Sequence, residues 1–261
     1  IFGRWDDTWP DAFARDVAAD GRRIILSVKA LRSNGSRIQW ADVAAARPGS
    51  ALYATMQRWA TAMRDLGTPI LFVFDHEPEA VSGGGTQAQY IAAYRNFAGV
   101  VASVGATNVE NIWIMTANAF KVGSRDRRQA VKWYPGDDVV DVIASDAYNW
   151  YTCRGKTEQW RSLETVITPM RNFGRQHPGK PLLLAEFASA EDPANPGRKA
   201  QWYRDARALF QQPGWEQFVG IVHFNRRGQQ QCNWQFDSSP AAQQAYVEMA
   251  QDPFYGGPGA G

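Results

Sequence analysis

The stretch Pro69-Ile-Leu-Phe-Val-Phe74 is an apolar run of strand length. A helical pattern from Thr86 to Val104 follows it, and then a second apolar run, Asn111-Ile-Trp-Ile-Met-Thr116. The helical pattern opens with Thr86-x-x-Gln89, the residues of a capping box, and stops at Gly105. The runs are apolar on both faces, which is typical of strands that lie between a core and covering helices. A strand, a helix and a second strand at this spacing predict a parallel βαβ unit.

The same alternation extends along the chain. Further strands are expected at 23–28, 139–144, 181–186 and 218–224, and further helices at 51–66, 156–176, 198–212 and 241–251. This unbroken alternation predicts an α/β fold, a (β/α)8 TIM barrel. A seventh strand is expected at residues 1–5, and the first barrel strand is expected to be missing from the chain. We expect one domain over residues 1–255 and a flexible Gly/Pro tail over 256–261.

Composition narrows the classes of partner. Of the 261 residues, 44% are hydrophobic and 21% charged, and 28 basic against 26 acidic side chains give a net charge of +2. So small a charge provides no field that would hold a nucleic acid backbone. The longest apolar runs have only the length of a strand, so no membrane span is expected. With three histidines and no His-x-His pair, we expect no metal site.

Carboxylates at the carboxyl ends of strands are the candidates for chemistry, because barrel active sites lie there. Glu77 and Glu186 each follow a hydrophobic strand, where an acidic side chain has no packing role. If the two strand ends face each other, the carboxyl groups would lie roughly 5–5.5 Å apart, as retaining glycoside hydrolysis requires. The alternative is a pair of structural salt bridges at the rim of the barrel.

Five stretches, in this order, are similar to glycoside hydrolase family 26: Phe74-Asp-His-Glu-Pro78, Trp133-Tyr-Pro-Gly-Asp-Asp-Val-Val-Asp141, Ser145-Asp-Ala-Tyr148, Lys180-Pro-Leu-Leu-Leu-Ala-Glu-Phe187 and Trp234-x-x-Asp-Ser-Ser-Pro240. The resemblance covers residues 24–254. It implies a retaining (β/α)8 enzyme related to endo-β-mannanases, with catalytic glutamates on the fourth and seventh barrel strands.

The resemblance also implies roles for single residues. Glu77 matches the family's acid/base and Glu186 its nucleophile. His76 matches the histidine before the acid/base, and Tyr148 the tyrosine that hydrogen-bonds the nucleophile.

The sequence departs from the family where the reacting sugar is bound, at Val73, Ser27-Val-Lys29 and Phe224-Asn225. The most common family substrate, β-1,4-mannan, is expected. The alternatives are β-1,3-xylan, mixed-linkage β-glucan and a non-catalytic sugar-binding barrel.

Other residues near the strand ends are candidates for binding substrate. Trp150, Tyr151 and Trp234 offer rings that stack on sugars, with core packing as the alternative. A further group could contact the sugar through a ring or through hydrogen bonds to its hydroxyl groups. The alternative is that these residues bond the backbone at the rim of the barrel. They are Phe224, Asn225, Lys29, Asn118 and Asp146. We expect a secreted, monomeric endo-β-glycosidase that acts on a polysaccharide and needs no cofactor.

The two cysteines are too few for a disulfide scaffold. Cys153 follows the strand before Glu186, and Cys232 follows the strand after it. Loops of this length bring two Cα atoms within the roughly 4.4–6.8 Å that a disulfide needs, so one bridge is expected. The alternative is two free thiols.

Overall fold

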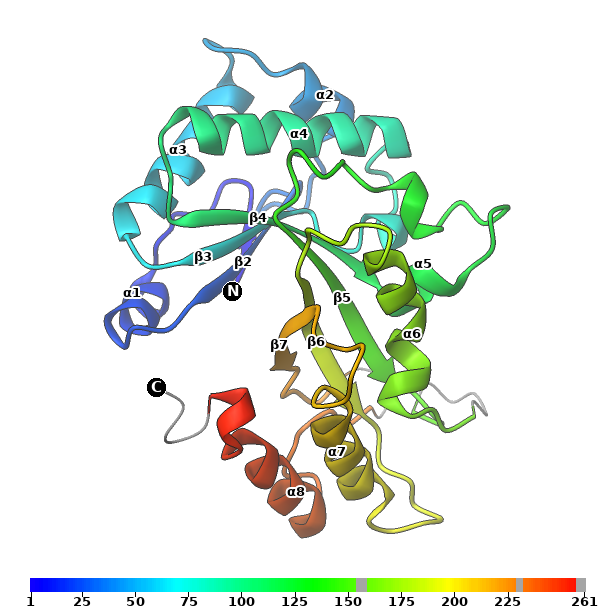
Figure 1. Ribbon diagram of the computed structural model, residues 1–261. Coiled ribbons are helices and arrows are strands. Elements are labelled where there is room, and N and C mark those ends of the chain that lie inside the picture. The colour runs from blue at the N-terminus through cyan, green and yellow to red at the C-terminus, as the bar shows by residue number, and fades with distance from the viewer. Residues whose placement is uncertain (154–158, 229–231, 257–261) are drawn as a thin grey trace. The chain divides into compact units, whose positions relative to one another are not determined.

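The computed structural model describes residues 1–153, 159–228 and 232–256 (Figure 1). The strands are β1 (Phe2–Arg4), β2 (Ile24–Lys29), β3 (Ile70–Phe74), β4 (Val109–Thr116), β5 (Val142–Asn149), β6 (Leu182–Ser189) and β7 (Phe218–His223). The helices are α1 (Ala12–Ala19), α2 (Trp40–Ala45), α3 (Ala51–Leu66), α4 (Gln87–Ser103), α5 (Ala117–Lys121), α6 (Leu163–Gly174), α7 (Arg198–Leu209) and α8 (Pro240–Ala250). Three short 3-10 turns are η1 (Pro78–Ala80), η2 (Ala130–Lys132) and η3 (Pro253–Tyr255).

The chain forms two compact units, Ile1–Ile143 and Ala144–Gly261. In the first unit, β1, β2, β3 and β4 follow one another in a parallel sheet. Ser27 lies opposite Val73 and Val28 opposite Phe74, so β2 and β3 end side by side. Helices α2 and α3 both contact α4. The core includes Phe72, Phe74 and Phe97, whose rings pack together.

In the second unit the strand order is β5, β6 and β7, and β6 and β7 are parallel. Helix α7 contacts α6 and α8. Its core includes Phe187 of β6, which packs on Trp202 and Tyr203 of α7. In the first unit the candidate residues follow β3, and in the second they lie within the carboxyl-terminal halves of β5 and β6.

Most predicted elements are confirmed. The seven expected strands correspond to β1 to β7, helix α3 is capped by Gly67 with a φ of 74°, and the capping box of Thr86 and Gln89 forms. The bounds of the strand expected at 139–144 are wrong, because β5 begins at Val142 and continues to Asn149. The extent of the helix expected at 156–176 is wrong, because Ser162 caps it and it begins at Leu163. Residues 156–158 and 257–261 of the expected helix and tail lie outside the described residues. An eighth strand is not found in the described part of the chain, and the position of the first barrel strand stays a prediction.

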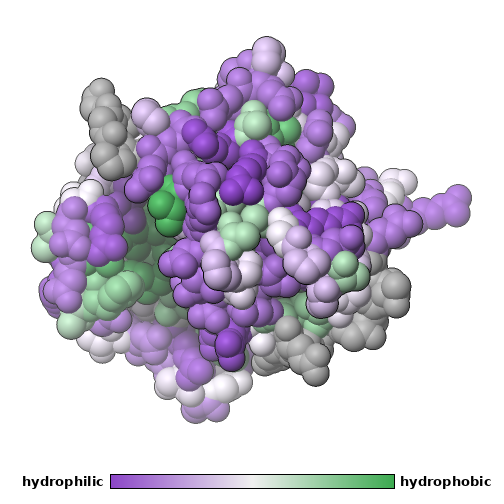
Figure 2. Space-filling model, turned by 90° about the horizontal axis from the view of Figure 1, so that it is seen from below, coloured by the Kyte–Doolittle hydropathy of each residue, from purple (hydrophilic) through white to green (hydrophobic). Residues whose placement is uncertain are grey.

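Most large apolar side chains are buried. Exposed ones include Val219 and Val222 on β7. Figure 2 shows a face on which hydrophilic residues predominate, with hydrophobic residues gathered in smaller areas. Among the described residues, no helix combines the length and the apolar character needed to cross a membrane.

Candidate active site

A sharp turn follows β3 and carries Asp75, His76 and Glu77. Asp75 and Glu77 have φ values of 47° and 51°, in the left-handed region that residues other than glycine rarely adopt. The amide of Asp75 donates to Val28 O (2.9 Å) on β2, and the amide of Glu77 donates to Ile114 O (3.0 Å) on β4. Such strained residues persist only where the surrounding structure fixes them, and they cluster at functional sites.

Asp75 stabilises this turn through its buried carboxylate. Its carboxylate is buried and accepts a hydrogen bond from Trp40 Nε1 (2.7 Å), with Arg37 Nη1 at 3.5 Å. Burial raises the pKa of Asp75, and the hydrogen bond from Trp40 and the charge of Arg37 oppose that rise only in part. Asp75 is therefore a structural carboxyl group that holds the turn in place.

Glu79 anchors the other side of the turn. It is buried, and its Oε1 accepts hydrogen bonds from the amide (2.8 Å) and the hydroxyl (2.6 Å) of Thr116, where β4 ends. Burial raises the pKa of Glu79 as well, against these two hydrogen bonds. Two of the three acidic residues at this turn thus serve its structure, and the third, Glu77, is half-buried.

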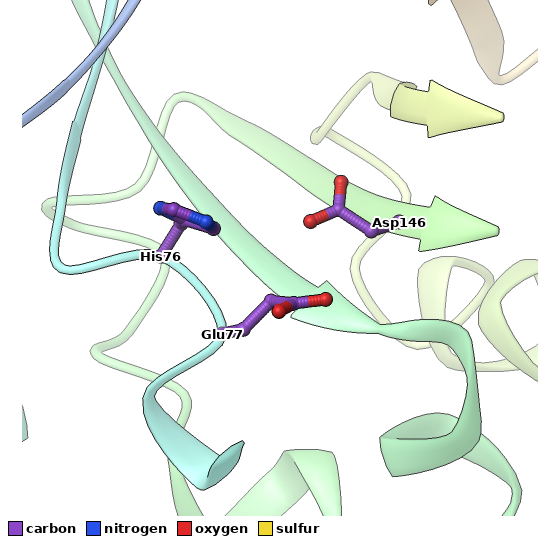
Figure 3. A group of neighbouring side chains, drawn as sticks. All are labelled: His76, Glu77 and Asp146. Atoms are coloured by element: carbon purple, nitrogen blue, oxygen red, sulfur yellow. The ribbon is translucent and has the colours of Figure 1, made fainter. Parts of the chain in front are cut away.

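His76 is held by β2. Its Nδ1 lies 2.7 Å from Ser27 Oγ, which is buried on β2. Burial lowers the pKa of His76 to about 4, and the positive charge of Lys29 contributes to this shift. The imidazole is therefore neutral at neutral pH. Figure 3 shows His76 and Glu77 on the turn after β3, and Asp146 on β5.

In the second unit, Glu186 lies near the carboxyl end of β6 and is half-buried. Tyr148 lies on the neighbouring β5, and its hydroxyl donates a hydrogen bond to Glu186 Oε2. A donor of this kind favours the ionised carboxylate and fixes its orientation. The hydrogen bond between Tyr148 and Glu186 that the family resemblance implies is therefore present.

An aromatic cluster surrounds Tyr148. The centroid of its ring lies 4.8 Å from that of Trp234, 5.3 Å from Trp150 and 5.8 Å from Phe224. Trp234 is only 3% exposed, so its ring packs against Tyr148 and does not present an open face. Trp150, Tyr151 and Phe224 are half-buried and keep part of their surface accessible.

The remaining predicted contacts lie at several strand ends. Lys29 ends β2, half-buried, with Nζ 5.5 Å from the centroid of the Phe2 ring. Asn118 is exposed and lies in α5, because β4 already ends at Thr116. Asn225 is exposed, and its Oδ1 accepts a hydrogen bond from the amide of Phe236 (3.2 Å). Asp146 is buried on β5.

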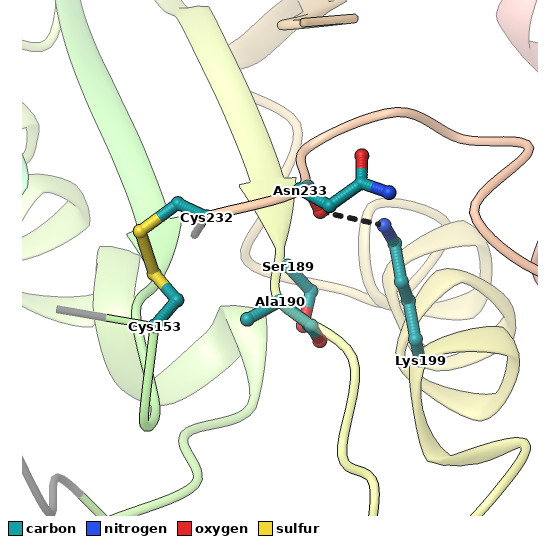
Figure 4. The surroundings of a disulfide bond; sticks show 6 residues. All are labelled: Cys153, Ser189, Ala190, Lys199, Cys232 and Asn233. Carbon is teal, nitrogen blue, oxygen red and sulfur yellow. Dashed lines mark hydrogen bonds between the residues drawn. A yellow bond between two sulfur atoms is a disulfide. The ribbon is translucent and has the colours of Figure 1, made fainter. Parts of the chain in front are cut away.

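The predicted disulfide between Cys153 and Cys232 is confirmed, with Cα atoms 4.7 Å apart (Figure 4). It joins the segment after β5 to the segment after β7. Both segments contribute rings to the aromatic cluster around Tyr148.

Sequence reasoning did not assign roles to Ser27 or Trp40. Ser27 is a small polar residue within an otherwise apolar strand, which is the pattern that would have indicated a polar partner. Trp40 is separated from Asp75 by 35 residues, and only the fold brings the two together.

Residues 49–173, which include Glu77 and Tyr148, match the sequence model of glycosyl hydrolase family 26. Endoglucanase H of Acetivibrio thermocellus is 33% identical over 168 residues, 62% of this chain and 17% of that protein. The chain thus matches less than a fifth of this relative's length.

Two solved structures show the fold. A GH26 β-mannanase from Bacteroides ovatus superposes with a TM-score of 0.63 at 19% identity, over 94% of this chain and 73% of that one. The GH26 domain of an endo-β-mannanase/endo-β-glucanase from Prevotella bryantii superposes with a TM-score of 0.57 at 13% identity, over 96% and 75%. The chain therefore resembles glycoside hydrolase family 26 in its sequence, and its α/β fold is that of the family's (β/α)8 barrels.

Proposed function

We propose that this protein is a retaining endo-β-glycosidase that cleaves a polysaccharide by double displacement. One observation carries the proposal. Glu186, in the carboxyl-terminal half of the buried strand β6, accepts a hydrogen bond from Tyr148, which suits a nucleophile that must stay ionised and correctly oriented. Glu77, on the turn after β3 with a φ of 51°, is the partner with the role of acid/base.

In the first step, Glu186 attacks the anomeric carbon, and Glu77 gives its proton to the glycosidic oxygen as the bond to the leaving sugar breaks. A covalent glycosyl-enzyme forms. In the second step, Glu77 accepts a proton from water, which attacks the anomeric carbon and releases Glu186 as a carboxylate. The product keeps its anomeric configuration, and the reaction needs no cofactor.

The substrate we propose is β-1,4-mannan. The names of the structural neighbours from B. ovatus and P. bryantii, a β-mannanase and an endo-β-mannanase/endo-β-glucanase, support this choice. The name of Endoglucanase H favours a β-glucan, so mixed-linkage β-glucan is the second candidate, with β-1,3-xylan as a third. The disulfide supports secretion, because such bonds persist outside the cytosol. We propose that the protein acts as a monomer.

The experiment is a panel of β-mannan, mixed-linkage β-glucan and β-1,3-xylan, scored by the release of reducing ends. We expect mannan to be cleaved most rapidly by the wild-type protein. Glu186→Ala should abolish turnover without loss of folding, and added azide should then give a glycosyl azide of inverted configuration. Binding of glycans without cleavage by the wild-type protein would instead indicate a sugar-binding barrel.

A further inference from the structure

Lys199 on α7 is fully buried in the second unit, an unusual place for an ammonium group. Its Nζ donates to Gln235 O (2.8 Å), Ser238 Oγ (2.9 Å) and, more weakly, Asn233 O (3.4 Å). An ammonium group has three protons, and here each has an acceptor. Burial lowers the pKa of Lys199 to about 8, which leaves it protonated at neutral pH.

The acidic groups around Lys199 support that charge. Ser238 Oγ, which accepts from Lys199, donates in turn to Glu191 Oε1 at 2.5 Å. The charges of Glu191 and Asp237 raise the pKa of Lys199 against the effect of burial. On its other faces Lys199 lies 6.0 Å from the centroid of the Tyr203 ring, and its charge lowers the pKa of His223.

The acceptors of Lys199 surround Trp234. Asn233 and Gln235, whose carbonyl oxygens it binds, are the residues immediately before and after that tryptophan (Figure 4 shows the bond to Asn233). The amide of Trp234 also donates to Arg226 O at 3.0 Å. The disulfide fixes Cys232, two residues before Trp234. The backbone that carries this indole is therefore restrained by the Lys199 hydrogen bonds, by the hydrogen bond to Arg226 O and by the disulfide.

The indole itself is closely packed. Its ring lies against Tyr148, at 4.8 Å between centroids, and against Trp150, at 5.0 Å. A Cβ atom on Gly228 would lie 2.7 Å from Trp234 Nε1, so only glycine fits beside the ring. A displacement of Trp234 would remove a wall of the space in which Tyr148 lies, and the Tyr148 hydroxyl donates to Glu186.

We propose that Lys199 is a positioning residue: by fixing the backbone on both sides of Trp234, it holds that ring against Tyr148 and so keeps the Tyr148 hydroxyl on Glu186. The proposal rests on the proposed function for its catalytic meaning. The series of contacts leads from Lys199 through Trp234 and Tyr148 to the Glu186 carboxylate, and it is present without substrate.

The test measures the titration of Glu186 directly. In protein carrying 13C at the glutamate carboxyl groups, Glu186→Gln assigns the Glu186 signal. Lys199→Met keeps the buried hydrocarbon and removes the ammonium group, whereas Gly228→Ala disturbs the Trp234 ring directly by steric overlap. The matched controls are Arg204→Met, a basic residue on α7 paired with Glu248, and Gly179→Ala, where a Cβ meets no atom within 4 Å.

We expect the midpoint of the Glu186 titration to rise by roughly half a pH unit or more in Lys199→Met and in Gly228→Ala, because a lost donor disfavours the ionised form. The two controls should leave it unchanged. A lower melting temperature with an unmoved Glu186 midpoint in both test variants would overturn the proposal and leave Lys199 a purely structural residue. A wild-type protein that cleaves no glycan would refute the proposed function alone, since this titration is read without substrate.

Discussion

The hydroxyl of Tyr148 on β5 donates a hydrogen bond to the carboxylate of Glu186 on β6. The two side chains come from neighbouring strands of the second unit, so the backbone of the sheet determines their approach. Hydrogen bonds to charged groups are the stronger ones and cost more to lose than neutral ones. Such a hydrogen bond orients the Glu186 carboxylate and favours its ionised form.

Removal of that donor tests the relationship. Tyr148→Phe should lower kcat/KM by about ten- to a hundredfold, the cost of a charge-assisted hydrogen bond of about 1.5–3 kcal/mol. The acid limb of the pH profile should also move to higher pH, because Glu186 would then protonate more readily. Tyr255→Phe is the control, since that hydroxyl binds the carbonyl groups of Ala206 and Arg207. An unmoved acid limb would contradict the assignment of Glu186.

The role of Glu77 depends on the leaving group. Glu77→Ala should cleave substrates with poor leaving groups very slowly, because no acid protonates the glycosidic oxygen. Aryl glycosides with good leaving groups should still load the enzyme and then stall as the covalent intermediate. Burst kinetics and mass spectrometry of the intact protein measure this. Equal losses on good and poor leaving groups would count against Glu77 as the acid.

The sequence predicted the positions of the candidate catalytic residues best where they lie close to the ends of strands. The apolar run before Glu77 correctly placed that residue after β3, whereas Glu186, expected to follow its strand, lies within β6, which continues to Ser189. Asn118 lies two residues after the end of β4, as expected, but the helical turn α5 that carries it gave no signal in the sequence. The burial of Trp234 depends on packing between segments far apart in the chain, so the sequence could not decide between sugar stacking and core packing for this ring.

Asp75 offers a test of the turn that carries Glu77. Asp75→Asn keeps an acceptor for the Trp40 indole and a residue type that tolerates a positive φ, so its stability should change by less than about 1 kcal/mol. Asp75→Ala loses both properties and should cost about 2–4 kcal/mol. Urea unfolding compares the two variants. Equal destabilisation by both substitutions would contradict this account of the turn.

Two histidines make stability depend on pH. Burial lowers the pKa of both His76 and His223 to about 4, below the ordinary value of 6.5. Between pH 6.5 and 4 the unfolded chain therefore binds more protons than the folded one, so the free energy of unfolding falls as the pH is lowered through that window. His223→Gln should weaken this dependence in urea titrations. NMR midpoints near 6.5 for the ring protons of both residues would refute the prediction.

The disulfide is the simplest prediction to check. Alkylation of the unreduced, denatured protein should modify no cysteine, and alkylation after reduction should modify both. Mass spectrometry of the intact protein counts the labels. Two labels without reduction would show free thiols at Cys153 and Cys232.

Loss of the bridge has a second consequence that follows from the position of Cys232. The bond closes a separation of 79 residues, which the chain-entropy model values at about 4 kcal/mol of stability. Cys232 also lies two residues before Trp234, so the bridge restrains the ring that packs on Tyr148. The double variant Cys153→Ser, Cys232→Ser should therefore unfold at lower urea concentration and also shift the acid limb of kcat/KM to higher pH. Because Lys199 still binds the carbonyl groups on either side of Trp234, we expect a smaller shift than in Tyr148→Phe. A shift as large as that of Tyr148→Phe would show that the bridge, and not Lys199, holds the ring.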